Sequence, residues 1–238
     1  MKVLDLSFPS PQANLACDEA LLDRCEEGGS GEILRFWESQ THFVVLGYSN
    51  KMRQEVNLFY CHRHKIPVLR RISGGGTVLQ GPGCLSYSLI LNIKKRNLES
   101  ITQTNRFVME KLKHAFGAVL KKPVAVKGHT DLVLGNKKFS GNAQRRKRKF
   151  ILFHGTFLLD FDLKKIEYTL KLPEIRPEYR KDRPHEEFVT NLCVKTARVK
   201  EAIKKEWSTS TKAQSPLKEK IAVLVKSHYI KKGWNEKF

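Results

Sequence analysis

Residues 70–78 carry the densest chemical signal in the chain: Arg70, Arg71, Ile72 and Ser73 precede three consecutive glycines and Thr77-Val78. Glycines after a strand let the backbone approach a ligand closely, and their N–H groups can cradle an anion. The arginines add bidentate hydrogen bonding suited to phosphate or carboxylate. The segment is neither a Walker A loop nor a GxGxxG turn. It therefore indicates an anion-binding loop, while a tight structural turn also remains open for the glycines.

Residues 128–144 and 154–159 form two further segments of interest. In the first, Lys138 follows the pair Gly135-Asn136 and precedes three small residues, Ser140, Gly141 and Ala143. Most lysines of a protein are simply solvated, and Lys138 taken alone is one of many. Its place just after a predicted hairpin, next to small side chains, suggests a cationic group above the floor of a cleft.

The elements around these segments follow from hydrophobic periodicity. We expect helices over residues 15–22, with Asn14 as the cap, and over 105–120. Two amphipathic helices end the chain, one burying Val199 and Trp207, and one capped by Ser215 with Pro216 first. A polar loop over 208–215 separates them. Strands are expected over 1–5, 33–37, 42–46, 67–70, 85–93 (half-buried), 131–134, 137–139 and 150–160.

These elements predict an α/β fold of α+β type, a mixed sheet with flanking helices, in a single domain over residues 1–238. Hydrophobic residues make up 40% and charged residues 29%, a globular composition. No apolar run approaches the roughly 20 residues that cross a bilayer, and the start does not resemble a signal peptide. We therefore expect a soluble, cytoplasmic protein.

The five cysteines form an odd set without a CxxC pair, so we expect them to be reduced and mostly buried. A metal site at residues 61–64 lacks a second ligand pair, and a polar helix end is favoured there. The formal net charge of +20 suits an anionic partner, either nucleic acid, a membrane surface or an acidic protein, and equally a generally lysine-rich proteome.

Taken together, the segments resemble the lipoate-protein ligase A family, within the larger group that includes biotin-protein ligases and octanoyltransferases. The resemblance also covers residues 14–20, 44–47, 189–192 and 225–234, and Asn50. The matching segments occur in a fixed order along nearly the whole chain, and this makes the resemblance specific. It implies the biotin/lipoate-ligase catalytic fold, with a mixed, largely antiparallel sheet.

The resemblance also implies site residues and substrates. Lys138 matches the family's active-site lysine, which contacts the acyl carboxylate and the activating phosphate. ATP with Mg²⁺, and lipoate or octanoate, are the implied substrates, and no resident metal site is expected. Nucleotide binding is implied for Arg71, Gly76, Thr77, Val78, Leu79 and Lys138. Substrate binding is implied for Arg70, Ser73, Gly74, Gly75, Lys138, Ser140, Gly141, His154, Gly155 and Thr156.

Three departures from the family pattern separate the hypotheses. Gln80 stands where many members have histidine, and the chain ends without the additional C-terminal domain of the long ligases, so an accessory protein is possible. Thioester-using relatives carry a cysteine nucleophile, and neither Cys84 nor Cys193 sits at a matching position. An ATP-dependent lipoate-protein ligase is therefore favoured, with acyl transfer from a carrier-protein thioester as the alternative.

The expected acceptors are lipoyl-domain proteins, namely the E2 subunits of 2-oxoacid dehydrogenases and the glycine-cleavage H protein. A nucleic-acid-binding protein is the distant alternative, based on the basic run 145–149 and the basic C-terminal segment. Few aromatic residues interleave those runs, and a solvated loop explains 145–149 as well. We favour attraction of an acidic acceptor, because complementary charge speeds encounter.

Overall fold

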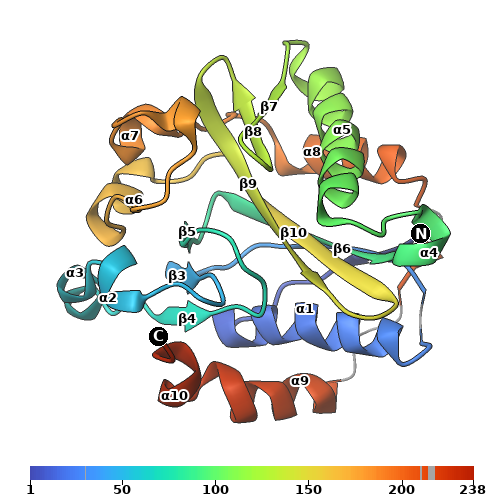
Figure 1. The fold of residues 1–238 in the computed structure, drawn as a ribbon, viewed down its shortest axis with the longest axis horizontal. Coiled ribbons are helices and arrows are strands. Elements are labelled where there is room, and N and C mark those ends of the chain that lie inside the picture. The colour runs from blue at the N-terminus through green and yellow to red at the C-terminus, as the bar shows by residue number, and fades with distance from the viewer. Residues whose placement is uncertain (30, 210, 214–217) are drawn as a thin grey trace.

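The computed structural model describes residues 1–29, 31–209, 211–213 and 218–238. Within these ranges one sheet of eight strands has the order β11-β1-β2-β6-β10-β9-β8-β7, and a second sheet has the order β4-β3-β5 (Figure 1). The strands are β1 (Lys2–Asp5), β2 (Ile33–Trp37), β3 (Phe43–Leu46), β4 (Val68–Arg70), β5 (Val78–Gln80), β6 (Cys84–Asn92), β7 (Ala125–Lys127), β8 (Asp131–Leu134), β9 (Lys137–Arg146), β10 (Phe150–Leu158) and β11 (Thr211–Lys212).

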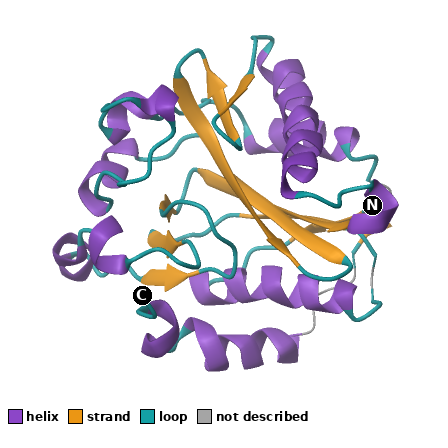
Figure 2. Cartoon of the chain, in the orientation of Figure 1, coloured by secondary structure: helices purple, strands orange, loops and turns teal. Residues whose placement is uncertain are grey.

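Helices surround both sheets (Figure 2). They are α1 (Pro11–Glu26), α2 (Met52–Glu55), α3 (Leu58–Arg63), α4 (Ile93–Arg96), α5 (Ile101–Leu120), α6 (Leu163–Thr169), α7 (His185–Phe188), α8 (Thr196–Glu206), α9 (Lys218–Leu224) and α10 (Lys232–Asn235), with a 3₁₀ turn η1 (Glu178–Arg180) and a π-helical turn η2 (Val225–Tyr229). β1 runs parallel to β2 and β11, and β3 parallel to β4, while the other pairs are antiparallel. This confirms the predicted mixed, largely antiparallel sheet.

The main sheet lies between two helical layers. α5 and α8 pack together on one face, and α1 and α9 pack together on the other side of the sheet (Figure 1). Alternate residues of β6, from Leu85 to Leu91, enter the core under α5 and α8. Ser86, Ser88 and Ile90 of the same strand are buried as well. The expectation that this strand is half-buried was therefore wrong, because α1 covers its second face.

Helix α1 begins earlier than predicted. Ser10 is the N-cap: its hydroxyl accepts a hydrogen bond from the Ala13 amide at 3.1 Å, and Pro11 occupies the first turn, where its missing N–H costs nothing. Asn14, the predicted cap, lies inside the helix and is fully buried. Its side-chain oxygen accepts from the Phe8 amide at 2.9 Å, so Asn14 fixes the chain entering the helix instead.

Three other expectations differ from the structure. Arg145 and Arg146 complete β9, so the basic run 145–149 is only partly a loop. The predicted polar loop 208–215 contains β11, which adds to the edge of the main sheet beside β1. The predicted cap at Ser215 and Pro216 lies outside the described residues. The final segment is not one helix, because the π-helical turn η2 separates α9 from α10.

The expectations about cysteines, metal sites and membrane spans can be compared with the structure. Cys17, Cys25, Cys61 and Cys84 are buried free thiols, and Cys193 is an exposed one. Residues 61–63 form the end of α3, as predicted. Over the ranges that the structure describes, no cluster of three histidine, cysteine or acidic side chains could hold a metal ion. None of the described helices is long and apolar enough to span a membrane.

Candidate active site

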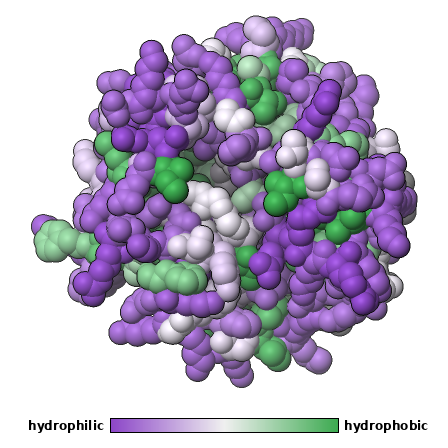
Figure 3. All heavy atoms as spheres, in the orientation of Figure 1, coloured by the Kyte–Doolittle hydropathy of each residue, from purple (hydrophilic) through white to green (hydrophobic). Residues whose placement is uncertain are grey.

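Two rows of small and polar residues cross the main sheet on the face towards α1. Register pairs Ala143 with His154, His154 with Ser88, and Ser88 with Arg35. The next row runs from Gly141 through Thr156 and Ser86 to Trp37. Paired residues of neighbouring strands share a face of the sheet. The two rows therefore form one surface, which we call the floor. The space-filling view shows pale residues in a hollow near the centre of this face, bordered by hydrophilic side chains and by several hydrophobic ones (Figure 3).

Lys138 lies at one end of this surface. The β8–β9 hairpin turns at Gly135-Asn136, as predicted, and the pairing shifts register between Leu132 and Val133. A β-bulge of this kind redirects the side chains of a strand. The Lys138 Nζ is 2.7 Å from Asp131 Oδ1. A Cβ on Gly141 would lie 2.7 Å from that nitrogen, so the lysine chain crosses directly over Gly141.

The glycine loop after β4 lies beside the same floor. Gly75 has a φ of +85°, a conformation that favours glycine, and a Cβ there would lie 3.2 Å from the Ala143 Cβ. On its other side the loop contacts Gly47, where a Cβ would lie 2.0 Å from the Gly75 carbonyl oxygen. Two glycines are thus required at one close backbone contact. The loop is a tight turn and also borders the cleft, so the two interpretations of its glycines are compatible.

Arg71 organises the loop from within. Its Nη2 donates to the carbonyls of Gly74 at 2.5 Å and Gly76 at 2.9 Å, and its Nε donates to Ser73 Oγ at 3.0 Å. Burial lowers the pKa of the guanidinium to about 10, so it remains charged at neutral pH. These contacts favour an action of Arg71 on nucleotide through the shape of the loop. A direct contact with nucleotide stays a prediction.

Arg70 points away from the floor, towards the C-terminal segment. Its fully buried guanidinium donates to the carbonyls of Gly47, Tyr48, Asn50, Trp234 and Asn235. Each of its three side-chain nitrogens donates to at least one backbone oxygen. Arg70 thus ties α10 to β4, and the contact with substrate predicted for it stays a prediction. Sequence reasoning could not separate the two arginines, because strand alternation sends adjacent side chains to opposite sides.

The same alternation divides the other predicted residues. Gly141, His154 and Thr156 lie on the floor. Ser140 and Gly155 lie on the opposite face, where Ser140 Oγ accepts from Asn142 Nδ2 at 3.2 Å and a Cβ on Gly155 would lie 1.9 Å from Asn142 Oδ1. Neither residue points its side-chain position towards the floor, and the substrate contact predicted for these two stays a prediction.

The predicted nucleotide segment 76–79 leads from the glycine loop into β5. Thr77 Oγ1 accepts from Asn50 Nδ2 at 3.1 Å, while the side chains of Val78 and Leu79 pack into the hydrophobic cores. β5 ends the described order of the small sheet. Any ligand contact of Val78 and Leu79 would therefore be made by backbone groups on that edge.

Ser73 connects the loop to His154. Because Arg71 Nε donates to Ser73 Oγ, the hydroxyl proton is free to donate to His154 Nε2, 2.5 Å away. We infer that His154 carries its own proton on Nδ1, which lies 4.0 Å from Asp18 Oδ2. Burial, reinforced by the charge of Arg71, lowers the pKa of His154 to about 4, so the ring is neutral at pH 7. Ser73 is fully buried, which argues against a nucleophilic role.

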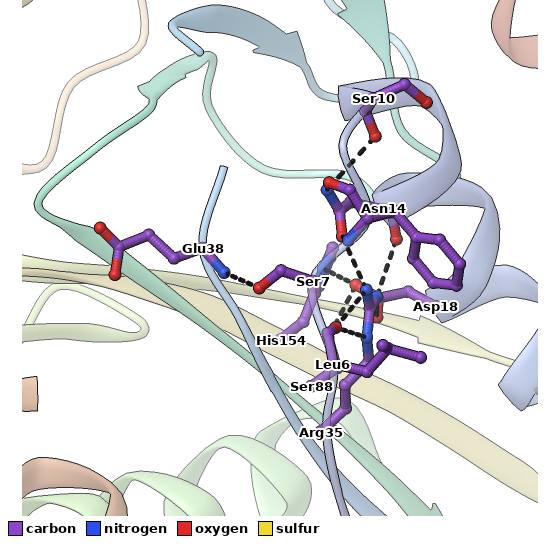
Figure 4. A network of polar contacts seen from close by, with 10 residues as sticks. Leu6, Ser7, Ser10, Asn14, Asp18, Arg35, Glu38, Ser88 and His154 are labelled. Atoms are coloured by element: carbon purple, nitrogen blue, oxygen red, sulfur yellow. Dashed lines mark hydrogen bonds and ion pairs between the residues drawn. The ribbon is translucent and has the colours of Figure 1, made fainter. Parts of the chain in front are cut away.

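The network continues into α1, as Figure 4 shows. Asp18 accepts from Arg35 Nη1 at 2.6 Å and from Ser88 Oγ at 2.7 Å. Arg35 is fully buried and also donates to the Asn14 and Leu6 carbonyls at 2.8 and 3.1 Å. Buried charges are tolerated when they are paired and hydrogen-bonded in this way. Asp18 lies in the segment 14–20, which carries part of the family resemblance. The sequence did not show that Arg35 is its partner, because that depends on the strand register.

Comparison with known proteins identifies the family of the chain. Residues 10–208 match the model of the "Lipoyl protein ligase A/B catalytic domain" family. The chain belongs to this family. It is 30% identical over 178 residues to a probable lipoate-protein ligase A of Mycoplasma pneumoniae, covering 74% of this chain and 51% of that protein. It is 29% identical over 210 residues to the octanoyltransferase LipM of Lysinibacillus sphaericus, covering 78% of this chain and 76% of that protein.

Solved structures share the fold. A lipoate-protein ligase A bound with ATP superposes with a TM-score of 0.82 at 24% identity, covering 99% of this chain and 98% of that one. The bi-partite lipoate protein ligase of Thermoplasma acidophilum gives a TM-score of 0.80 at 24% identity, covering 99% and 95%. The chain spans about half the length of the Mycoplasma relatives that it matches, 51% and 48%.

Proposed function

We propose that this chain activates lipoate or octanoate with ATP and transfers the acyl group to a lysine of a lipoyl-domain protein. The observation that carries the proposal is the Lys138 ammonium, held over the small-residue floor beside the glycine loop. In the first step the carboxylate attacks the α-phosphorus of ATP, giving acyl-AMP and pyrophosphate. In the second the neutral acceptor amine attacks the acyl carbon, an amide bond forms, AMP leaves with the C–O bond electrons, and the amine releases a proton to solvent.

Each part of the site has a role in this scheme. Lys138 stabilises negative charge on the reacting oxygens, an effect typically worth ~3 kcal/mol for a preorganised group. The backbone of residues 74–77 lies against the nucleotide phosphates, and Arg71 holds that backbone in shape. Mg²⁺ enters with the nucleotide, because this ion is usually held mainly by substrate phosphates and water.

Four of the five thiols are buried, which argues against them as the nucleophile of a cysteine-dependent transferase, while Cys193 is exposed. Burial raises the pKa of Cys17, Cys25 and Cys84 to about 12 and that of Cys61 to about 11, which opposes formation of a thiolate. Acyl transfer from a carrier-protein thioester remains the second candidate, since several relatives are LipM octanoyltransferases that match over about three quarters of their length.

The proposed acceptors are lipoyl domains, including those of 2-oxoacid dehydrogenase E2 subunits and the glycine-cleavage H protein. The similar Thermoplasma ligase forms a lipoylation system with its E2 lipoyl domain, and that ligase is bi-partite, which also supports an accessory protein as a second partner. The net charge of +20 suits an acidic acceptor. Nucleic acid is disfavoured because basic residues of the run 145–149 serve the fold: Arg146 donates to the Leu98 and Glu99 carbonyls, and Lys147 pairs with Asp23.

To test the proposal, purified protein is incubated with an apo lipoyl domain, and the mass of the product is measured by mass spectrometry. Three donors are compared: lipoate with ATP and Mg²⁺, synthetic lipoyl-AMP, and octanoyl-carrier protein without ATP. We expect acylation from the first two, with pyrophosphate released from the first, and retention of both in a Cys84→Ser/Cys193→Ser double variant. Acylation from octanoyl-carrier protein alone, lost in the double variant, would establish the transferase instead.

A further inference from the structure

The side chain of Lys138 is restrained at its tip. A free lysine side chain carries about 2 kcal/mol of rotamer entropy, so a site that uses its ammonium has to orient it. Here Asp131 Oδ1 accepts one of its three hydrogens, while Gly141 leaves room for the chain beneath. The backbone is fixed as well, since the Lys138 carbonyl accepts from the Thr190 amide at 2.9 Å. Two ammonium hydrogens remain for an anionic ligand.

Asp131 is itself held by a second contact. Its Oδ2 accepts from the Tyr179 hydroxyl at 2.7 Å. Burial, followed by the charge of Asp131, raises the pKa of Tyr179, which keeps the phenol protonated as the donor. The Tyr179 backbone is tied to the same hairpin by Arg183, which donates to the carbonyls of Tyr179 at 2.8 Å and of Asn136 at 2.9 Å. Residues 177–183 thus form a strap across the β8–β9 turn.

We propose that Asp131, fixed by Tyr179, is a positioning residue that sets the direction of the Lys138 ammonium before substrate binds. The inference rests on the proposed function, in which Lys138 contacts the acyl carboxylate and the phosphate. Asp131 also weakens the binding of an anionic ligand, because its negative charge lies close to where that ligand binds. Orientation for the transition state is thus gained at the expense of ground-state attraction, and the two effects separate kinetically.

Kinetics with synthetic lipoyl-AMP and an apo lipoyl domain test this separation. In Asp131→Asn we expect kcat to fall about tenfold to a hundredfold, while the KM for lipoyl-AMP stays constant or falls. Tyr179→Phe should lower kcat less, about threefold to tenfold. Asp131→Glu, which keeps the charge, should recover part of the loss. Asp182→Asn is the matched control, because it removes the same charge from a strap side chain that is 93% exposed. A raised KM with unchanged kcat in Asp131→Asn would overturn the inference.

Chemical labelling tests the contact without the reaction. A short pulse of acetic anhydride acylates free amines, and mass spectrometry compares Lys138 with the exposed Lys137 beside it. We expect Lys138 to react several times faster in Asp131→Asn than in the unmodified protein or in Asp182→Asn, with Lys137 unchanged. If this response appears and no lipoylation occurs with any donor, the proposed function fails while the positioning contact stands. Unchanged labelling and kinetics in an active protein would overturn the contact alone.

Discussion

The two faces of the main sheet are lined by different kinds of side chain. Under α5, the Phe157 ring stacks on Tyr87 at 4.8 Å and contacts Phe116 at 4.6 Å. Towards α1, the neighbouring residues of the same strand, His154 and Thr156, join rows of small and polar side chains. One strand therefore serves cohesion on one face and the candidate site on the other. The candidate site thus lies on the face where polar side chains are held by their neighbours, and the opposite face packs the core.

The first prediction tests the cohesive face. Phe157→Ala removes a fully buried ring and should lower the free energy of unfolding by about 3–5 kcal/mol. Lipoylation per folded molecule should persist, because the ring lies opposite the floor. Urea unfolding gives the stability, and Phe59→Ala is the control, since that ring is 76% exposed. Loss of turnover in a still-folded Phe157→Ala protein would show that the two faces are coupled.

The second prediction tests the site face. Lys138→Ala should reduce acyl transfer about 10²–10³-fold, while the free energy of unfolding changes by less than about 1 kcal/mol, because the side chain is 26% exposed and its ion pair is partly solvated. Lys137→Ala, one residue away and exposed, should behave like the unmodified protein. Transfer within a few-fold of normal in the folded Lys138→Ala variant would remove Lys138 from the mechanism.

Local sequence patterns predicted most of the helices and strands, because these elements depend on residues that are near one another in the chain. Short runs of β-forming residues located β2 and β8, alternation located β6, and the Gly-Asn pair located the β8–β9 turn. What alternation could not supply is register between strands distant in sequence. Arg35 joins Asp18 only because β2 pairs with β6, and the pairing of β9 with β10 places Gly141, and not Ser140, on the face that carries His154 and Thr156. Asp131 lies within the segment 128–144 that the sequence analysis singled out, but its contact with Tyr179, 48 positions along the chain, depends on the fold.

The third prediction concerns pH and the network under the glycine loop. The pKa of His154 is lowered to about 4 in the folded protein, so the unfolded chain binds more protons between that pH and about 6.5. The stability contribution of neutral His154 is therefore present above about pH 6.5 and lost as the pH falls towards 4. We expect about 2–3 kcal/mol of acid destabilisation that is missing in His154→Gln. Urea unfolding of both proteins from pH 7 to 4 measures it, and parallel curves would contradict the buried neutral ring.

The last prediction makes the same small change on each face. Gly141→Ala places a methyl group against the movable end of Lys138, so the lysine shifts, acyl transfer falls about threefold to tenfold, and stability changes by less than about 0.5 kcal/mol. Gly155→Ala places it against Asn142 and the Gly141 carbonyl oxygen, 2.6 Å away, where backbone has to move. That overpacking should lower the free energy of unfolding by about 1–3 kcal/mol with a smaller effect on turnover per folded molecule. Thermal unfolding measures the stability of both variants, and kinetics with lipoyl-AMP measure their turnover. If Gly141→Ala proves the less stable variant and Gly155→Ala the less active one, the assignment of the two faces is reversed.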